Sequence, residues 1–298
     1  MKLRYKYRIY PNEQQEQQMI SVGGSSRFVY NYFLKQNINQ YQIDKKFIWH
    51  FDMNKKLTLV KKQFTWLYDT YNAVLQSSLG DLDQALKNIK RGAGFPKFKS
   101  KYTTPVSFNY PRFVSIVNNL LRLPKIGDIK IVFDRALPKF TGCTIYKTAR
   151  GWYASFVVDK EEQILTTDIT NSIGIDVNSD YTALSTGELI TNLKPLKKKQ
   201  KKLKLLQRQL ARTRKGSKNR QKAKIKLARV HDQIRCQRLN HIHQISSRIT
   251  KVYDLVSVET LKIEQMKKNH YEAKAIADTG WAMFIAALEY KSKLLGNH

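Results

Sequence analysis

Two acidic residues lie next to apolar, strand-like runs and could support metal-dependent chemistry. Asp176 is inside the run Ile173-Gly-Ile-Asp-Val177, and Glu259 directly follows Leu255-Val-Ser-Val258. An ionised carboxylate inside an apolar strand is costly unless it binds a metal or a hydrogen-bond donor. Two-metal nucleases use a strand-centre Asp and a strand-end Glu, separated by a crossover, to hold two Mg²⁺ ions about 4 Å apart. We therefore take Asp176 and Glu259 as the candidate catalytic residues.

A third carboxylate to complete such a site is not evident in the sequence. Asp278 stands before the predicted last helix, where it is expected to act as an N-cap, and Glu289 falls on the outward side of that helix. The pattern predicts a vestigial site that requires no cofactor, with room for a residual Mg²⁺ at Asp176 and Glu259. The alternative is an active or weakly nicking site in which Asp278 is an unusual third ligand.

The composition favours a polyanionic partner. The chain has 298 residues with 54 Lys and Arg against 23 Asp and Glu, a net charge of +31, and 42% apolar residues suffice to build cores. Cys143 and Cys236 are too few for a disulfide framework or a four-cysteine zinc site, so no zinc is expected. Because no long uncharged apolar run or signal peptide is found, we predict a soluble cytoplasmic protein, nucleoid-associated and without a membrane partner.

The positive charge is concentrated in one segment. Residues 194–230 hold seventeen Lys or Arg and no acid, more than half of the net charge. The leucine spacing there and the turn Lys215-Gly-Ser-Lys218 predict an antiparallel helical hairpin over residues 194–250. Two smaller basic features are the predicted N-terminal strand, residues 2–9, in which cations alternate with apolar residues, and the glycine-bearing loop 91–101. That loop, with Phe95 and Phe98 among its cations, reads as a nucleic-acid contact or as a plain linker.

From these features we predict the following nucleic-acid-binding residues: Lys2, Arg4, Lys6, Arg8, Lys97, Lys99, Lys101, Arg208, Arg212, Arg214, Lys215, Lys218, Arg220, Lys222, Arg229, Arg235 and Arg238.

The remaining patterns predict an α+β protein of several domains. Residues 12–90 read as helices, and the seam Leu75, Leu79, Leu82, Leu86, Ile89 predicts a core-facing helix that ends near Arg91. Short β-rich runs at residues 113–117, 121–123, 129–133, 143–147 and 152–158 suggest a small barrel that the N-terminal strand could join, with Asn118-Asn119 as one turn.

Several short motifs occur in an order that resembles the TnpB family of transposon-encoded, RNA-guided nucleases. They are Leu79-Gly-Asp-Leu-Asp-Gln-Ala-Leu-Lys-Asn88, Gly94-Phe-Pro-Lys-Phe-Lys99, Gly151-Trp-Tyr153, Gly174-Ile-Asp176, Lys215-Gly-Ser-Lys-Asn219, Lys226-Leu-Ala-Arg-Val-His231, Val258-Glu-Thr-Leu261 and Leu288-Glu-Tyr-Lys291. The resemblance implies a β-barrel wedge domain, residues 1–10 plus 100–165, with an inserted helical recognition lobe, residues 11–99. It further implies a RuvC-like (RNase H-like) α/β domain, residues 172–298, which carries the basic hairpin.

The departures from the family pattern shape the expected function. The resemblance assigns the first two RuvC acids to Asp176 and Glu259. The family's zinc ribbon and third acid have no counterpart in a sequence that ends at His298. Asn178 stands where the family usually has a glycine. We therefore expect a truncated, nuclease-dead repressor that binds a guide RNA and double-stranded target DNA with a short flanking motif. The alternatives are a guided endonuclease with a degraded site and a transposon-derived RNA-binding remnant.

Overall fold

The computed structural model describes residues 1–102, 104–165, 168–259 and 278–298. The chain forms two compact units, one of Lys2–Asp159 and one of Met1 with Lys160–His298. Each unit is described by itself.

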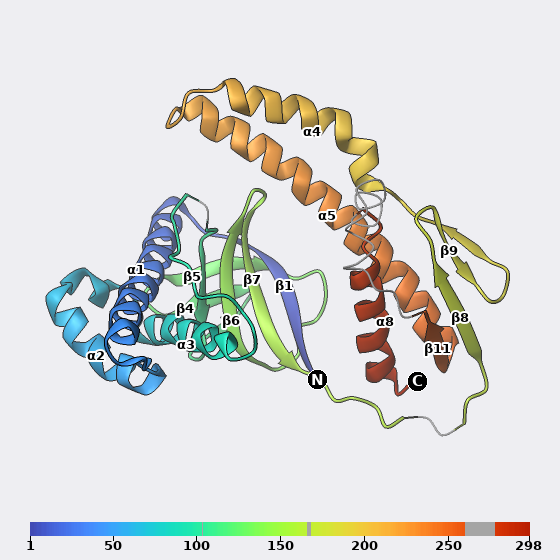
Figure 1. Cartoon of the computed structure of the whole chain (residues 1–298), viewed down its shortest axis with the longest axis horizontal. Coiled ribbons are helices and arrows are strands. Elements are labelled where there is room, and N and C mark those ends of the chain that lie inside the picture. Colours follow the sequence, from blue (N-terminus) through green and yellow to red (C-terminus); the bar gives the residue numbers. More distant parts are fainter. Residues whose placement is uncertain (103, 166–167, 260–277) are drawn as a thin grey trace. The chain divides into compact units, whose positions relative to one another are not determined.

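A seven-stranded antiparallel sheet organises the first unit (Figure 1). Its spatial order is β2-β6-β7-β1-β5-β4-β3. The strands are β1 (Lys2–Tyr10), β2 (Ser107–Tyr110), β3 (Ser115–Val117), β4 (Leu120–Leu123), β5 (Gly127–Val132), β6 (Phe140–Thr148) and β7 (Gly151–Asp159). The N-terminal strand therefore joins the sheet, as predicted, and pairs with β7 from Lys2↔Asp159 to Ile9↔Trp152.

The described strands form an open, curled sheet, and the prediction of a barrel is wrong as far as closure is concerned. The edge strands β2 and β3 have one neighbour each in the strand order. Curling is nevertheless strong, because side chains from all seven strands contact one apolar core, with Tyr7, Tyr110 and Phe156 among its largest buried members. Asn118 and Asn119 both have positive φ, 50° and 59°, which is the conformation that a tight hairpin turn between β3 and β4 requires.

Helices form the rest of the first unit around a second apolar core. They are α1 (Glu13–Asp44), α2 (His50–Gln63), the 3₁₀ helix η1 (Thr65–Asp69) and α3 (Asn72–Ile89). The predicted seam is confirmed, since Leu75, Leu79, Leu82 and Leu86 are all fully buried. The helix α1 begins with a capping box, in which the Asn12 side chain accepts from the Gln15 N–H and the Gln15 side chain accepts from the Asn12 N–H.

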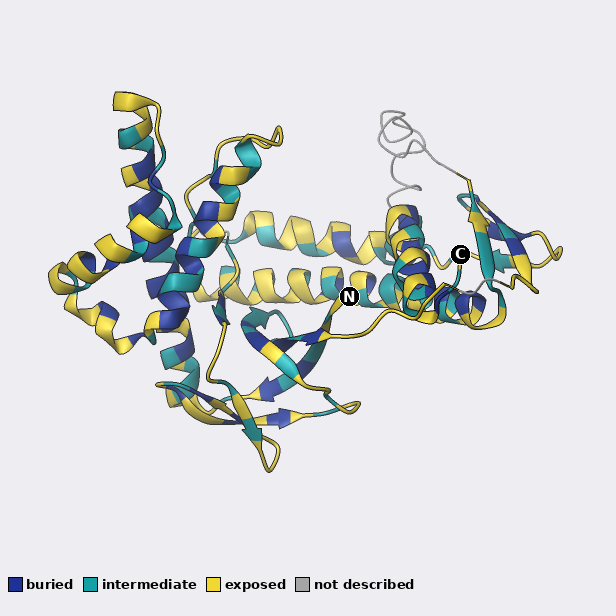
Figure 2. Ribbon diagram, turned by 90° about the horizontal axis from the view of Figure 1, so that it is seen from below, coloured by how far each residue is buried: buried dark blue, intermediate teal, exposed yellow. Residues whose placement is uncertain are grey.

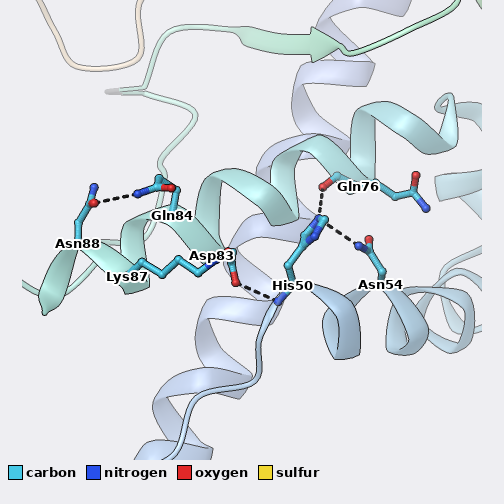
Figure 3. Close-up of polar contacts among 7 residues, drawn as sticks. All are labelled: His50, Asn54, Gln76, Asp83, Gln84, Lys87 and Asn88. Carbon is cyan, nitrogen blue, oxygen red and sulfur yellow. Dashed lines mark hydrogen bonds and ion pairs between the residues drawn. The ribbon is translucent and has the colours of Figure 1, made fainter.

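The start of α2 is held by a side chain of α3 (Figure 3). Its N-cap residue Trp49 offers no side-chain acceptor, but the Asp83 carboxylate accepts from the His50 N–H at 3.0 Å. Asp83 also pairs with Lys87 one turn later, at 2.6 Å. A helix N-terminus needs acceptors for its unpaired N–H groups, and here a neighbouring helix supplies one.

The second unit contains a four-stranded sheet and three helices among its described residues. The sheet order is β10-β9-β8-β11, with β8 (Ser172–Val177), β9 (Tyr181–Leu184), β10 (Leu189–Thr191) and β11 (Leu255–Val258). The helices are α4 (Pro195–Arg212), α5 (Lys218–Val252) and α8 (Trp281–Leu295). The predicted hairpin is confirmed, because α4 packs along α5 after a short turn, and β11 returns parallel to β8.

Burial in this unit is uneven along the hairpin (Figure 2). A small cluster around Leu203, Val230 and Ile234 joins α4 to α5, while Ile242 and Ile249 of α5 pack with α8 and the sheet. Within the residues that the structure describes, no helix combines the length and apolar content needed to cross a membrane.

Candidate nucleic-acid interface and acidic site

Asp176 and Glu259 occupy equivalent positions on two neighbouring parallel strands. The register pairs Ile175 of β8 with Val258, the last residue of β11; Asp176 follows Ile175 within β8, and Glu259 directly follows the end of β11. Both side chains are exposed. The sequence argument that Asp176 suffers a desolvation cost is wrong, because the period of two along β8 buries Ile175 and Val177 and turns Asp176 to the opposite face.

Asn178 is a functional neighbour whose role the sequence did not show. Its Nδ2 donates to Asp176 Oδ2 at 2.8 Å, and Asn192 Nδ2 donates to the Asn178 carbonyl, also at 2.8 Å. The residue that departs from the family pattern thus orients the candidate acid. The only signal for it was its position two residues after Asp176.

Asp278 has hydrogen-bond partners in α4 and α5. It is 4% exposed and accepts from the backbone N–H groups of Leu196 and Lys197, at 2.9 and 3.0 Å. Arg238 donates to its carboxylate at 3.0 Å and to its carbonyl at 2.8 Å. The prediction that Asp278 caps the last helix is wrong, because it caps α4. Three N–H groups already donate to its carboxylate, and its use as a third metal ligand, the alternative drawn from the sequence, stays a prediction.

Mg²⁺ prefers oxygen ligands and commonly keeps several waters, and carboxylates such as those of Asp176 and Glu259 are ligands of this type. A residual Mg²⁺ at these two residues stays a prediction. Among the described residues, no group of three or more His, Cys, Asp or Glu converges on a metal position. Of the motif Val258-Glu-Thr-Leu261, residues 260 and 261 lie outside the described residues.

The hairpin displays most of its predicted contact residues to solvent. Exposed members of the predicted set are Arg208, Arg212, Arg214, Lys215, Lys218, Lys222 and Arg229. Arg235 is exposed and forms an ion pair with Asp232 one turn earlier, at 3.6 Å. Because residues 194–230 contain no acid, the exposed cations of α4 and of the first half of α5 form a surface that suits phosphate groups.

Two predicted contact residues of the hairpin have structural roles instead. Arg220 Nη1 donates to the carbonyls of Leu210 and Thr213, both at 2.9 Å, and so satisfies carbonyls at the end of α4. Arg238 is held against Asp278, and only 17% of its side chain is exposed. Sequence spacing cannot distinguish Arg220 and Arg238 from their exposed neighbours, because the groups that these two arginines contact lie elsewhere in the chain.

On the outer face of the first unit's sheet, cations lie beside aromatic rings. Lys2 and Arg4 are exposed, while Lys6 Nζ lies 3.9 Å from the centroid of the Tyr153 ring and Arg8 donates to the Tyr153 hydroxyl at 3.3 Å. Gly151, with a φ of +128°, makes room for this arrangement, since a Cβ there would come within 2.6 Å of Arg8 Nη2. The sequence predicted the row of cations but not the tyrosine among them.

The predicted contact residues of loop 91–101 differ in their surroundings. Lys97 and Lys101 are exposed. Lys99 is half-buried, with its Nζ 3.8 Å from the centroid of the Tyr30 ring, and burial lowers its pKa. The loop therefore combines exposed cations with an anchor to α1.

Two family profiles match the chain. Residues 155–270 match one described as "Probable transposase", and residues 1–46 match one described as "Helix-turn-helix domain". In this structure residues 1–46 form β1 and α1, so the second description does not correspond to two consecutive helices here.

Similar proteins span nearly the whole chain. A "Putative RNA-guided DNA endonuclease" of Streptomyces pristinaespiralis is 31% identical over 99% of this chain and 76% of its own length. The "Putative RNA-guided DNA endonuclease InsQ" of Escherichia coli (strain K12) is 30% identical over 96% of this chain and 77% of its own length. The fold is similar to the solved structure "Cryo-EM structure of the Cas12f1-sgRNA-target DNA complex", with a TM-score of 0.53, 15% identity and coverage of 96% and 72% of the two chains. On the strength of sequence similarity across nearly all of its residues, the chain belongs to the TnpB family.

Proposed function

We propose that the protein binds a guide RNA and uses its base pairing to occupy matching double-stranded DNA beside a short flanking motif. We further propose that it leaves this DNA uncut and represses transcription by occlusion. In guided systems base pairing reads the sequence, while the protein contributes backbone contacts and recognition of the flanking motif.

The observation that carries the proposal is the exposed basic surface of the α4–α5 hairpin. Neutralising phosphates with Lys and Arg releases condensed counterions, which supplies affinity without sequence preference. A protein with such a surface needs another source of sequence specificity, and base pairing by a bound guide RNA provides it. The names of the relatives support a guide RNA, as does the presence of both RNA and DNA in the structurally similar Cas12f1 complex.

Three observations support occupation without cutting. Asp278 is used by α4 and Arg238, Asn178 occupies a lone pair of Asp176, and the described residues bring no third ligand to the Asp176–Glu259 pair. Two-metal cleavage needs enough carboxylate oxygen to hold both ions around the scissile phosphate. A single Mg²⁺ at this pair would neutralise charge without completing that arrangement.

Guided cleavage is the second candidate function. It is favoured by the parallel register, which sets Asp176 and Glu259 side by side at one end of the sheet, and by the word endonuclease in the relatives' names. Under this candidate the pair would hold catalytic Mg²⁺, and removing either carboxylate would abolish cutting.

One experiment separates the two candidates. The purified RNA–protein complex is mixed with supercoiled DNA that matches the guide, in Mg²⁺ or Mn²⁺, and both cutting and binding are measured. We expect uncut DNA, and Asp176→Ala and Glu259→Ala should bind it with unchanged affinity. Guide-dependent cutting that either substitution abolishes would establish the endonuclease instead.

Sequencing the RNA that purifies with the protein tests guidance itself. A discrete scaffold joined to a guide of fixed length is expected, whereas a heterogeneous RNA population would favour the RNA-binding remnant. The contribution of the hairpin is tested by the double variant Arg208→Gln, Arg212→Gln. It should bind nucleic acid more weakly, and the slope of log affinity against log salt concentration should fall by roughly one per lost phosphate contact.

A further inference from the structure

Four aromatic rings meet where α1 ends and the loop after α3 begins. Tyr41 stacks on Phe47, with centroids 4.7 Å apart and planes 11° from parallel. Phe47 contacts Trp49 edge-on at 5.8 Å and Phe95 at 6.2 Å. We call these four residues the aromatic corner. It lies entirely within the first unit and joins segments about fifty residues apart in sequence.

The backbone on both sides of the corner is fixed by hydrogen bonds. Lys45 ends α1 in the left-handed conformation, and the next N–H, that of Lys46, donates to Asp44 at 3.0 Å. The loop that carries Phe95 begins with a turn at the end of α3, where the Ala93 N–H donates to the Asn88 carbonyl.

The far end of that loop is tied to α1. Asn31 and Lys99 form a reciprocal pair, in which the Lys99 N–H donates to Asn31 Oδ1 and Asn31 Nδ2 donates to the Lys99 carbonyl, both at 2.8 Å. With both ends fixed, the loop holds Phe95 in place at the corner and is more than a linker.

Core packing does not account for all four rings. Phe47 and Trp49 pack against the core of the helical part, whereas Tyr41 and Phe95 lie outside it and are 37% and 41% exposed. Ile43, two residues after Tyr41 in sequence, is also exposed, at 82%. An exposed group of large apolar side chains marks an interaction site more often than isolated ones do.

Cations surround these rings. Lys45 Nζ lies 5.4 Å from the centroid of the Tyr41 ring, and Lys90 Nζ lies 5.9 Å from that of Trp49. Lys46, Arg91 and Lys97 are exposed nearby in sequence. An apolar protein partner would have to desolvate these charges, whereas a nucleic acid offers a phosphate for the cations and a base for the rings.

We infer that the aromatic corner binds unpaired RNA bases by stacking on Tyr41 and Phe95, while the surrounding lysines contact the adjoining phosphates. The inference rests on the proposed RNA binding and adds to it a site for single-stranded RNA on the helical part of the first unit. Duplex RNA keeps its bases stacked internally and cannot use the rings, so the site discriminates single strands from duplexes.

The test compares ring-removing variants of the full chain. Tyr41→Ala and Phe95→Ala each remove a partly exposed ring that contacts Phe47, and neither removes a charge or a residue of the buried core. The probes are a fluorescent single-stranded RNA of about twelve nucleotides, a duplex RNA and a single-stranded DNA of the same length. Stacking on aromatic side chains contributes about 1–3 kcal/mol per base, so each variant should bind the single-stranded RNA roughly 5- to 150-fold more weakly.

The control variant is Phe51→Ala. Phe51 is 69% exposed and lies beside Lys55, at 4.3 Å, so it shares the chemistry of the corner but lies outside it. Its removal should leave RNA affinity within about twofold, and the salt slope should be unchanged in all three variants because no charge is lost.

The outcomes separate this inference from the proposed function. Wild-type protein that binds no RNA overturns both. Wild-type binding with unchanged affinity in Tyr41→Ala and Phe95→Ala, equal losses on duplex RNA, equal losses in Phe51→Ala, or losses confined to single-stranded DNA would each overturn the inference and leave RNA binding standing.

Discussion

Asp176 illustrates how one position in a strand sets the chemistry open to a carboxylate. The apolar run around it predicted the strand and the acid within it. The alternation of Ile173, Ile175 and Val177 with Gly174 and Asp176 also indicates that the acid points away from the apolar face, which the desolvation argument overlooked. In the structure Asp176 is exposed beside Glu259 and accepts from Asn178. An exposed carboxylate is solvated, so it needs no metal to be stable, and its presence alone does not indicate catalysis.

Glu16 is a second residue whose partners come from distant parts of the chain. It accepts from Lys147 and from Trp152 Nε1, the latter at 3.1 Å, and the hydrogen bond from Lys147 is the main cause of its lowered pKa. A carboxyl whose pKa is lower in the folded state stabilises the fold above its unfolded pKa, and the stabilisation disappears as the pH falls through the folded pKa.

Glu16→Gln should therefore lower the free energy of unfolding by about 1 kcal/mol at neutral pH, because the pair is partly exposed. The difference from wild type, measured by thermal unfolding, should shrink as the pH falls below the ordinary carboxyl pKa of 4.5. Glu13→Gln, which removes the other acid of the first turn of α1, controls for the helix dipole. A pH-independent difference would contradict the assigned role.

At the level of elements, α4 begins with Pro195 but has no side-chain cap from its own N-cap residue. Its N-cap residue Lys194 offers no acceptor, and its first turn carries cations, which the helix dipole disfavours. Asp278, about eighty residues later, supplies the missing negative charge and both acceptors. Sequence reasoning placed a cap at Asp278 but gave it to the nearest helix, because local spacing cannot reveal a partner so far away.

Asp278→Ala should destabilise the second unit strongly. Removing the carboxylate leaves the guanidinium of Arg238, of which only 17% of the side chain is exposed, without its charged partner, although its hydrogen bond to the carbonyl of residue 278 remains. Such a change costs about 3 kcal/mol. The measurement is chemical unfolding of the full chain. Glu188→Ala, which breaks the exposed Arg248–Glu188 pair, should cost at most about 1 kcal/mol. Equal effects of the two substitutions would show that the Asp278 cap contributes little.

The elements with strong periodicity could be predicted from the sequence, and the weaker ones could not. The leucine seam of α3, the turn at Asn118-Asn119 and the hairpin α4–α5 follow directly from spacing and turn chemistry. Strand β2 escaped prediction because Ser107-Phe-Asn-Tyr110 has only two apolar residues between Pro105 and Pro111. The closed barrel was also wrong, because closure depends on pairing between edge strands that lie far apart in sequence.

At the scale of the whole molecule, the net charge of +31 is distributed over surfaces of both units. The second unit presents the hairpin, and the first presents the cations of β1 and the aromatic corner. Each suits a different part of a nucleic acid: phosphates for the hairpin and unpaired bases for the corner. Under the proposed function the charge supplies general affinity, and the rings and the paired guide supply discrimination.

Guided DNA binding is tested most directly by measuring the affinity of the purified RNA–protein complex for two DNA duplexes of equal length and charge at one salt concentration. One duplex matches the guide segment of the co-purified RNA, and the other has a scrambled sequence. We predict that the matched duplex binds about a thousandfold more tightly and remains intact in Mg²⁺. Equal affinity for the two duplexes would contradict guided DNA binding.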